Sequence, residues 1–238
     1  MEKGEKMIYL AGDTHGKLET YKVVDFIKKE ASIRTLSKED YVIILGDVGV
    51  CWDGGDRDRY VVQQLNELPV TVLWLDGNHE NFAIIDSLPV TDWHGGKVQF
   101  IGEKIIHLMR GYVYEICGKT FWAFGGGFSI DKMYREEGVD WWPREMPSEE
   151  EYLRGKENLQ KYDNKVDYMI THTAPRNIAY RLVKNLRPGE EELQEYLQEI
   201  SNETTFKEWY FGHWHIDRKI ENYVGLYDNI VCLEEKEE

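Results

Sequence analysis

Short apolar runs and amphipathic segments alternate along the first third of the chain. Residues 7–11, 41–45 and 70–75 are strand-sized apolar runs, whereas residues 18–33 and 57–68 carry apolar side chains at helical spacing. Pro69 ends the second of these helical segments. Strands that alternate with helices are typical of a sheet covered by helices. The pattern therefore predicts an α/β fold for this part of the chain.

The pattern changes in the middle of the sequence. Residues 97–124 contain short segments in which apolar and polar residues alternate, and Cys117-Gly118-Lys119 has the composition of a hairpin turn. We therefore expect antiparallel strands here. Three glycines at 125–127 end this pattern, and an insertion rich in aromatic and charged residues follows at about 128–147.

Helical and strand-like patterns return after this insertion. Ser148 and Glu151 have the spacing of a capping box, which predicts a helix from there to about residue 162. Residues 168–171 and 209–211 are strand candidates, with further short candidates up to residue 233. Between them lies a helix whose apolar face is formed by Leu193, Tyr196, Leu197 and Ile200.

Composition favours one cytoplasmic domain. The chain has 238 residues, of which 42% are hydrophobic, enough for one sizeable core. We expect a single domain over residues 1–238, with the insertion at about 128–147 and an acidic tail at 234–238. Apolar runs are too short to span a bilayer, and the first residues lack the apolar stretch of a signal peptide. Cys51, Cys117 and Cys232 form no disulfide framework, and each is expected to be a small buried apolar residue.

The charge balance limits the partners. A formal net charge of -15 disfavours broad binding to long DNA or RNA, because an acidic surface repels the phosphate backbone. It is compatible with a small phosphorylated or nucleotide-like substrate, since bound metal ions can reverse the local potential. The sequence does not predict an oligomeric state.

Five short polar clusters each follow a strand candidate. They are Gly12-Asp13-Thr14-His15-Gly16, Gly46-Asp47, Gly77-Asn78-His79-Glu80, Thr171-His172 and Gly212-His213-Trp214-His215. Loops at the carboxyl ends of strands are where α/β proteins gather polar groups around a ligand. In the last cluster, a strand-like backbone would place both imidazoles on one side. We expect the clusters to meet at one site.

Seven residues of these clusters are candidate metal ligands, with two carboxylates, one amide oxygen and four imidazoles. The candidate metal ligands are Asp13, His15, Asp47, Asn78, His172, His213 and His215. A nitrogen and oxygen set without thiolate suits Mn²⁺ best, with Fe or Zn²⁺ as alternatives. Seven ligands exceed what one tetrahedral ion takes and fit two ions roughly 3.5–4 Å apart. A water between two such ions would lose a proton near neutral pH and attack phosphorus in line.

The order of these motifs resembles the calcineurin-like metallophosphoesterase superfamily, from Asp13 to His215. The resemblance implies a two-sheet β-sandwich flanked by helices, with the metals at the carboxyl-terminal ends of the strands. It implies that one ion is held by Asp13, His15, Asp47 and His215. It further implies that Asp47 bridges to a second ion held by Asn78, His172 and His213. His79 would be the general acid for the leaving oxygen, oriented by Asp13.

Two positions depart from part of this superfamily. Its protein phosphatases carry an arginine after the second motif and another before Gly-Asn-His-Glu, where this chain has Cys51 and Asp76. The loss of two phosphate-binding guanidiniums weakens the reading as a protein serine/threonine phosphatase. That reading stays an alternative to a phosphomonoesterase or phosphodiesterase, and an inactive binding module on the same fold is a third. Arg135 or Arg144, in the insertion, could replace the missing cations.

Other polar and aromatic residues have structural interpretations beside functional ones. Glu80 is expected to fix a loop or cap a helix, and His79 could be a histidine that only orients the site. His94 and His107 belong to no motif and are expected to be structural. Trp141 and Trp142 could form a lid that stacks on a base, although packing against the core is the favoured interpretation.

Overall fold

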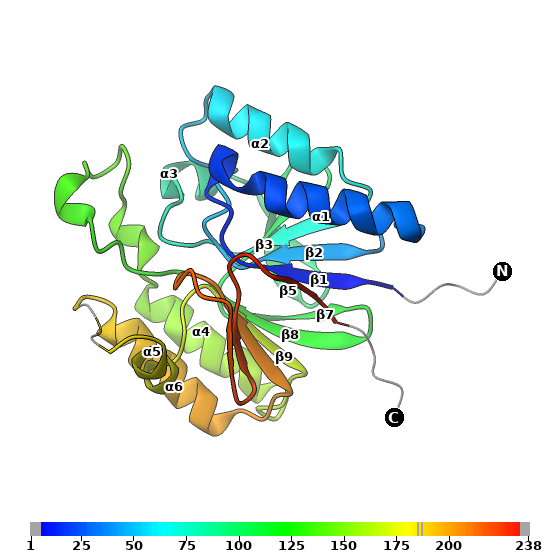
Figure 1. The fold of residues 1–238 in the computed structure, drawn as a ribbon. Helices are drawn as coiled ribbons and strands as arrows, with labels where there is room; N and C mark the ends of the chain where they lie inside the picture. The colour runs from blue at the N-terminus through cyan, green and yellow to red at the C-terminus, as the bar shows by residue number, and fades with distance from the viewer. Residues whose placement is uncertain (1–5, 185, 187, 234–238) are drawn as a thin grey trace.

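Two β-sheets pack face to face between two layers of helices (Figure 1). The structure is a computed structural model that describes residues 6–184, 186 and 188–233. The acidic tail expected at 234–238 lies outside the described residues. The arrangement of two sheets flanked by helices is the fold class that the sequence predicts.

The first sheet has seven strands in the order β13-β1-β2-β3-β6-β5-β4. Its strands are β1 (Ile8–Ala11), β2 (Tyr41–Ile44), β3 (Thr71–Trp74), β4 (Val90–Trp93), β5 (Gly96–Ile101), β6 (Ile105–Leu108) and β13 (Ile230–Cys232). β1, β2, β3 and β6 run parallel, and the edge strands pair antiparallel. The helices α1 (Thr20–Ile33), α2 (Asp56–Asn66) and α3 (Phe82–Ile85) contribute to the core on its outer face.

The second sheet has six strands in the order β11-β12-β10-β9-β8-β7. They are β7 (Tyr112–Ile116), β8 (Lys119–Phe124), β9 (Tyr168–Thr171), β10 (Glu208–Phe211), β11 (Arg218–Ile220) and β12 (Tyr223–Gly225). The helices α4 (Glu149–Gln160), α5 (Arg176–Leu182) and α6 (Glu191–Glu203) contribute to the core on its outer face. Ser148 and Glu151 form the predicted capping box at the start of α4.

The sheets meet because their strands are apolar on both faces. In β1, Ile8 and Leu10 point into the core between the sheets, whereas Tyr9 and Ala11 point into the core beneath α1 and α2. A strand buried on both sides reads as a continuous apolar run, which is why β1 to β3 are recognisable in the sequence.

The middle segment differs in part from the predicted antiparallel strands. β5 with β6 and β7 with β8 are antiparallel, but β6 also pairs parallel to β3, and β8 pairs parallel to β9. The chain crosses from the first sheet to the second between β6 and β7. β6 and β8 therefore each have an antiparallel neighbour on one side and a parallel neighbour on the other. The hairpin turn consists of Cys117 and Gly118, both with positive φ, and Lys119 already belongs to β8.

Only Cys51 of the three cysteines is buried, so the prediction for Cys117 and Cys232 is wrong.

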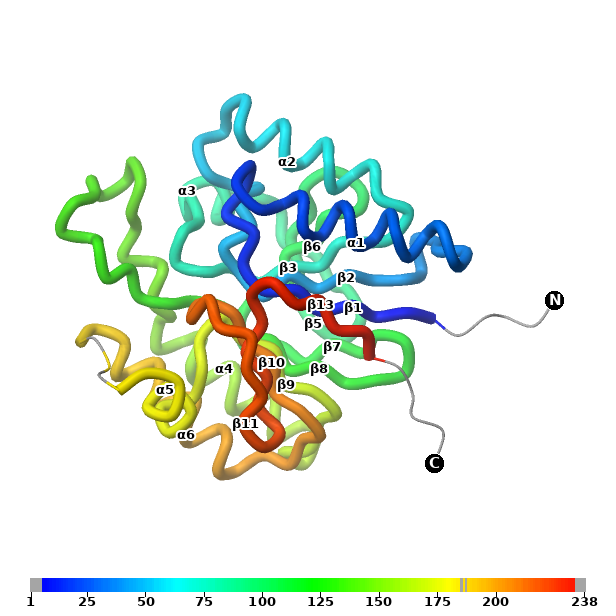
Figure 2. The backbone as a smooth tube through the Cα atoms, viewed as in Figure 1, coloured from blue at the N-terminus to red at the C-terminus, as the bar shows by residue number. Residues whose placement is uncertain are grey.

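Several helix boundaries also differ from prediction. Residues 16–18 form a 3₁₀ turn, so α1 starts at Thr20, and α2 covers 56–66 instead of 57–68. The short elements α3, α5 and β4 carry too little pattern to be predicted. The insertion at 128–147 contains two 3₁₀ turns, Lys132–Tyr134 and Pro143–Glu145, and projects from the body as the green loop on the left of Figure 2.

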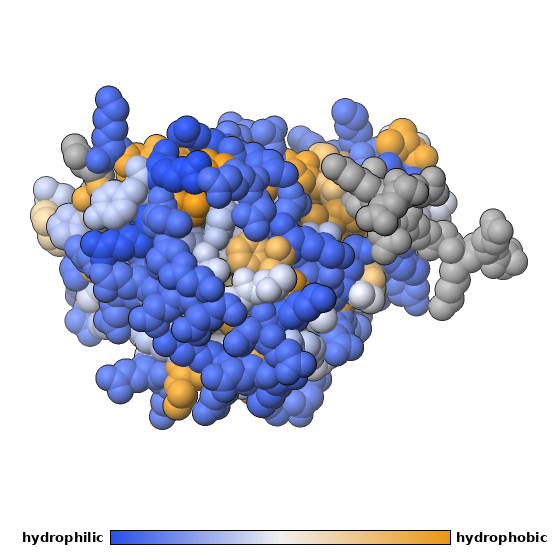
Figure 3. All heavy atoms as spheres, turned by 90° about the horizontal axis from the view of Figure 1, so that it is seen from below, coloured by the Kyte–Doolittle hydropathy of each residue, from blue (hydrophilic) through white to orange (hydrophobic). Residues whose placement is uncertain are grey.

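One face of the surface is mainly hydrophilic, with hydrophobic residues in scattered patches (Figure 3). Over the part of the chain that the structure describes, no helix has both the length and the apolar character required to cross a membrane.

Candidate metal centre

The predicted ligands follow the carboxyl ends of five strands. Asp13 and His15 follow β1, Asp47 follows β2, and Asn78 follows β3, whereas His172 follows β9, and His213 and His215 follow β10. Within each sheet the strands concerned run parallel and are neighbours, so their ends lie at one edge. The structure brings all seven side chains together where these edges of the two sheets meet.

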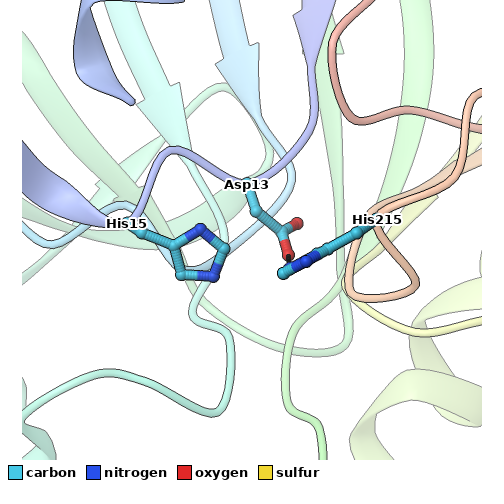
Figure 4. A group of neighbouring side chains, drawn as sticks. All are labelled: Asp13, His15 and His215. Atoms are coloured by element: carbon cyan, nitrogen blue, oxygen red, sulfur yellow. Dashed lines mark ion pairs between the residues drawn. The ribbon is translucent and has the colours of Figure 1, made fainter. Parts of the chain in front are cut away.

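Asp13, His15 and His215 form the first group. One potential ligand atom from each lies within 4.8 Å of the others. Figure 4 shows the Asp13 carboxylate between the two imidazoles, and its Oδ2 lies 3.1 Å from Nε2 of His215. His15 comes from the loop after β1, so residues 200 positions apart in sequence face each other here.

Asp47 connects this group to a second group, which consists of Asn78, His172 and His213. Its Oδ2 lies 3.6 Å from Nε2 of His15 and 3.6 Å from Nε2 of His172. On the far side, Oδ1 of Asn78 lies 3.1 Å from Nε2 of His172 and 3.0 Å from Nδ1 of His213. One carboxylate oxygen therefore lies at the same distance from one imidazole nitrogen of each group of candidate ligands.

Hydrogen bonds orient the imidazoles of His172 and His15. Nδ1 of His172 donates a hydrogen bond of 2.7 Å to the carbonyl oxygen of Leu45. Nδ1 of His15 lies 2.9 Å from the carboxylate of Glu19. Both rings thereby present Nε2 to Asp47. A partner on one ring nitrogen fixes which nitrogen is available as a ligand.

His213 has the opposite orientation. Its Nε2 lies 3.2 Å from Oε1 of Glu190, so Nδ1 faces Asn78. Burial lowers the pKa of His213, but the Glu190 carboxylate outweighs this effect and raises the pKa to about 9. Glu190 is itself buried and accepts further hydrogen bonds from Thr173, Gln194 and the N–H of Phe128.

The backbone at the site is conformationally unusual. His15, Asp47, His213 and His215 all have φ between 41° and 63°, the left-handed region that costs a residue with a side chain about 1–3 kcal/mol. Both histidines of Gly212-His213-Trp214-His215 are therefore in a loop, and the expected strand-like geometry is wrong. Gly77 and Gly212 are needed for close approach, because a Cβ there would collide with the carboxylates of Asp47 and Asp13.

A buried chain of hydrogen bonds fixes the Asn78 amide. Its Nδ2 donates to Oγ of Ser129 at 3.1 Å, and that hydroxyl donates to Oε2 of Glu145 at 2.6 Å. The N–H of Ser129 donates to Oε1 of Glu145 at 2.9 Å. All three residues are buried, and Ser129 and Glu145 come from the insertion. The insertion thus holds Oδ1 of Asn78 toward the histidines.

His79 lies beside the ligands. Its backbone N–H donates to Oδ1 of Asp47 at 2.8 Å, and its buried Nδ1 has no hydrogen-bond partner among the described residues. Burial lowers the pKa of His79, Asp47 partly opposes this, and the positive charge of Arg135 lowers it further.

Among the described residues no hydrogen bond joins Asp13 to the ring of His79, and the expected role of Asp13 in orienting His79 stays a prediction. Asp13 accepts a hydrogen bond from the N–H of His213 through Oδ1, while its buried Oδ2 receives none from the described part of the chain. An orphaned carboxylate oxygen that points at imidazole nitrogens is suited to a cation.

Burial raises the pKa of Asp47, but the imidazoles around it, His172 first, hold that pKa well below its usual value. The donor set fits divalent metal ions.

Two cavities adjoin these residues. One of about 560 Å³ lies on the side of His213 and is lined by Phe128, Ile130, Trp214 and Glu190 among others. The other, of about 500 Å³, lies on the side of His15 and is lined by Lys17, Trp52, Arg57 and Arg135 among others. Asp47 and His79 line both cavities.

The remaining candidates divide between structure and site. Asp76, at one missing-arginine position, forms a buried ion pair with Arg110 and contacts His107 at 3.0 Å. Arg144 instead pairs with Glu151 and lines neither cavity, whereas Arg135 lines the His15-side cavity. His94 is bonded to a backbone carbonyl away from the site.

Glu80 and the two tryptophans have structural contacts. Glu80 accepts the N–H of Val48 at 2.8 Å, which fixes the loop that carries Asp47. Trp142 packs against the core beneath α1 and α2. Trp141 lies 5.5 Å from Nζ of Lys132, and neither ring lines the two cavities.

The fold and the cluster of carboxylates and imidazoles define a candidate metal-dependent hydrolase. The family model of calcineurin-like phosphoesterases matches residues 6–217, and the chain belongs to this family. Among curated proteins, none matches the sequence. A crystal structure of a mutant cold-active protein tyrosine phosphatase is similar, with 14% identity over 98% of this chain and 76% of that chain, at a TM-score of 0.35. Family membership supports a phosphoesterase activity of the divalent-metal-dependent type.

Proposed function

We propose that this protein hydrolyses phosphate esters of small or nucleotide-like molecules with the help of two divalent cations, Mn²⁺ first among them. The observation that carries the proposal is the position of Asp47, whose Oδ2 is 3.6 Å from imidazoles of both ligand groups. Asp13, His15 and His215 would hold one cation, Asn78, His172 and His213 the other, and Asp47 both. When bound, the cations supply Lewis acidity toward the phosphate and lower the pKa of water.

The side chains have separate roles in this reaction. Oxygen from water forms a new bond to phosphorus, the ester P–O bond breaks, and the leaving oxygen takes a proton. His79 lines both cavities and is positioned by Asp47, so it is the group proposed to donate that proton. Glu19, Glu190 and Ser129 keep the ligands aimed at the cations.

Two alternatives are less well supported. A protein serine/threonine phosphatase would need arginines where this chain has Cys51 and Asp76, and Asp76 forms a buried pair with Arg110 outside both cavities. An inactive binding module would tolerate the loss of ligands, but all seven are present and oriented.

The three cysteines, all within the described residues, form no disulfide, in keeping with a cytoplasmic location.

The test compares bis-p-nitrophenyl phosphate with p-nitrophenyl phosphate as substrates for chelator-treated protein reloaded with Mn²⁺. Metal-dependent release of p-nitrophenol from either ester supports the proposal, and the faster ester identifies a diesterase or a monoesterase. Binding of two Mn²⁺ without cleavage of either ester would favour the binding module.

A further inference from the structure

The two cavities beside the site differ in charge. The His213-side cavity contains the carboxylates of Asp131 and Glu190 next to apolar side chains. The His15-side cavity contains Lys17, Arg57 and Arg135 around the indole of Trp52. We call these four residues and the space they line the basic pocket. Three cations at one cavity stand out on a chain with a formal net charge of -15.

Two of these cations have no acidic partner. In the regions that the structure describes, neither Lys17 nor Arg57 forms an ion pair with a carboxylate, and Lys17 contacts the ring of Tyr60 at 5.0 Å. Arg57 lies in the first turn of α2, which also carries Asp56, paired with Arg59, and the buried Asp58. Both side chains are solvent-accessible at the rim of the cavity, so a ligand can reach them without displacing an existing partner.

Arg135 forms the inner part of the same pocket. Asp131 holds its guanidinium through two hydrogen bonds of 2.8 and 2.9 Å, and Arg135 and His79 line the same cavity. Trp52 lies next to His79, with ring centroids 6.2 Å apart. The pocket thus continues from the reacting centre to Lys17 and Arg57, and Asp47 is the one carboxylate in its lining among the residues that the structure describes.

We propose that the basic pocket binds a second anionic group of the substrate, a phosphate or a carboxylate. The substrate class is then a phosphodiester that has substituents on both sides of the scissile phosphorus. The anionic substituent lies in the basic pocket, and the less polar one lies against Phe128 and Trp214 in the His213-side cavity. This inference rests on the proposed phosphoesterase function and specifies its substrate.

A pair of substrates that differ by one phosphate tests the pocket. Thymidine 5′-(p-nitrophenyl phosphate) and its 3′-phosphorylated form release the same chromophore. With Mn²⁺-loaded protein, we expect the extra phosphate to raise kcat/KM about 10-fold or more, as charge-assisted hydrogen bonds of this kind do. Lys17→Gln and Arg57→Gln should each lower this ratio, and raised ionic strength should lower it too. Arg59→Gln is the matched control, because Arg59 lies on the same helix but pairs with Asp56 outside the pocket.

Calorimetry provides a readout that needs no turnover. Metal-free protein should bind methylenediphosphonate, and the double variant Lys17→Gln/Arg57→Gln should lose that binding while Arg59→Gln retains it. Cleavage of neither ester would contradict the proposed function. The titration with methylenediphosphonate would still show whether the basic pocket binds an anion. Cleavage of both esters at equal kcat/KM, with no binding of methylenediphosphonate, would overturn the inference and leave the proposed function in place.

Discussion

The side-chain nitrogen of Asn78 lies 3.1 Å from the hydroxyl of Ser129, and this contact determines which end of the amide faces the metal site. The hydroxyl can accept this hydrogen bond because it donates its own proton to Glu145. A residue of the insertion therefore sets the direction of a ligand that follows β3.

Ser129→Ala should weaken metal binding. Without the hydroxyl, the amide of Asn78 loses its buried acceptor and can turn its nitrogen toward the histidines. We expect the affinity for Mn²⁺ to fall about 10- to 100-fold, the range found when groups that orient metal ligands are removed. Isothermal titration of metal-free protein measures this change. Ser201→Ala, whose hydroxyl contacts Tyr223 far from the site, is the control, and an unchanged affinity in Ser129→Ala would refute the role of Ser129.

Glu190→Gln tests the partner of His213. The amide keeps the size of the side chain but removes the charge that fixes Nε2 of His213, so Nδ1 is presented less firmly to the site. We expect about a 10-fold loss of Mn²⁺ affinity. Glu191→Gln changes the neighbouring exposed residue and should leave the affinity as it is. Equal affinities in the two variants would mean that Glu190 does not orient His213.

The acid sensitivity of the fold should depend on Glu151. Burial raises its pKa, but Arg110 and Arg144 outweigh burial, so the pKa in the folded state lies below the ordinary value. The unfolded chain then binds more protons as pH falls, and the stability that Glu151 contributes above about pH 4.3 is lost below it. Glu151→Gln should therefore lose stability less steeply than wild type between about pH 5 and pH 3.

Urea unfolding of metal-free protein measures this slope without a contribution from metal release. Glu149→Gln, in the first turn of the same helix, should retain the slope of the wild type. Parallel curves for wild type and Glu151→Gln would contradict the assignment.

Trp142 should be a packing residue. Its ring contacts the core beneath α1 and α2 and does not line either cavity. Trp142→Leu should lower the free energy of unfolding by about 1–3 kcal/mol, since it removes part of a packed ring. The KM for nucleotide esters should not change. A raised KM at wild-type stability would instead support a lid that stacks on a base.

The convergence of the candidate ligands could be predicted from the sequence because each follows an apolar run that is buried on both faces. The runs before Asp13, Asp47 and Asn78 are recognisable as strands without knowledge of their neighbours. The reason given for His213 and His215 was nevertheless wrong, since their convergence depends on left-handed backbone conformations that a strand pattern does not indicate.

The residues that orient the ligands could not be predicted. Glu190 precedes α6 and Ser129 lies in the insertion, and neither belongs to a motif or a periodic segment. They act only because both segments fold over the site, which is a property of the tertiary structure. The parallel pairing of β6 with β3 and of β8 with β9 could not be predicted for the same reason. The alternating pattern of a strand does not specify its second neighbour.

The most direct test of the two-cation proposal measures Mn²⁺ stoichiometry and turnover together in wild type and Asp47→Asn. Wild type should bind two Mn²⁺ per chain and cleave the preferred p-nitrophenyl ester. Asp47→Asn, which loses the carboxylate placed between the two ligand groups, should bind fewer ions and lose about 100- to 1,000-fold in kcat, the range found when a group that stabilises transition-state charge is removed. One ion per wild-type chain, or full activity in Asp47→Asn, would contradict the proposal.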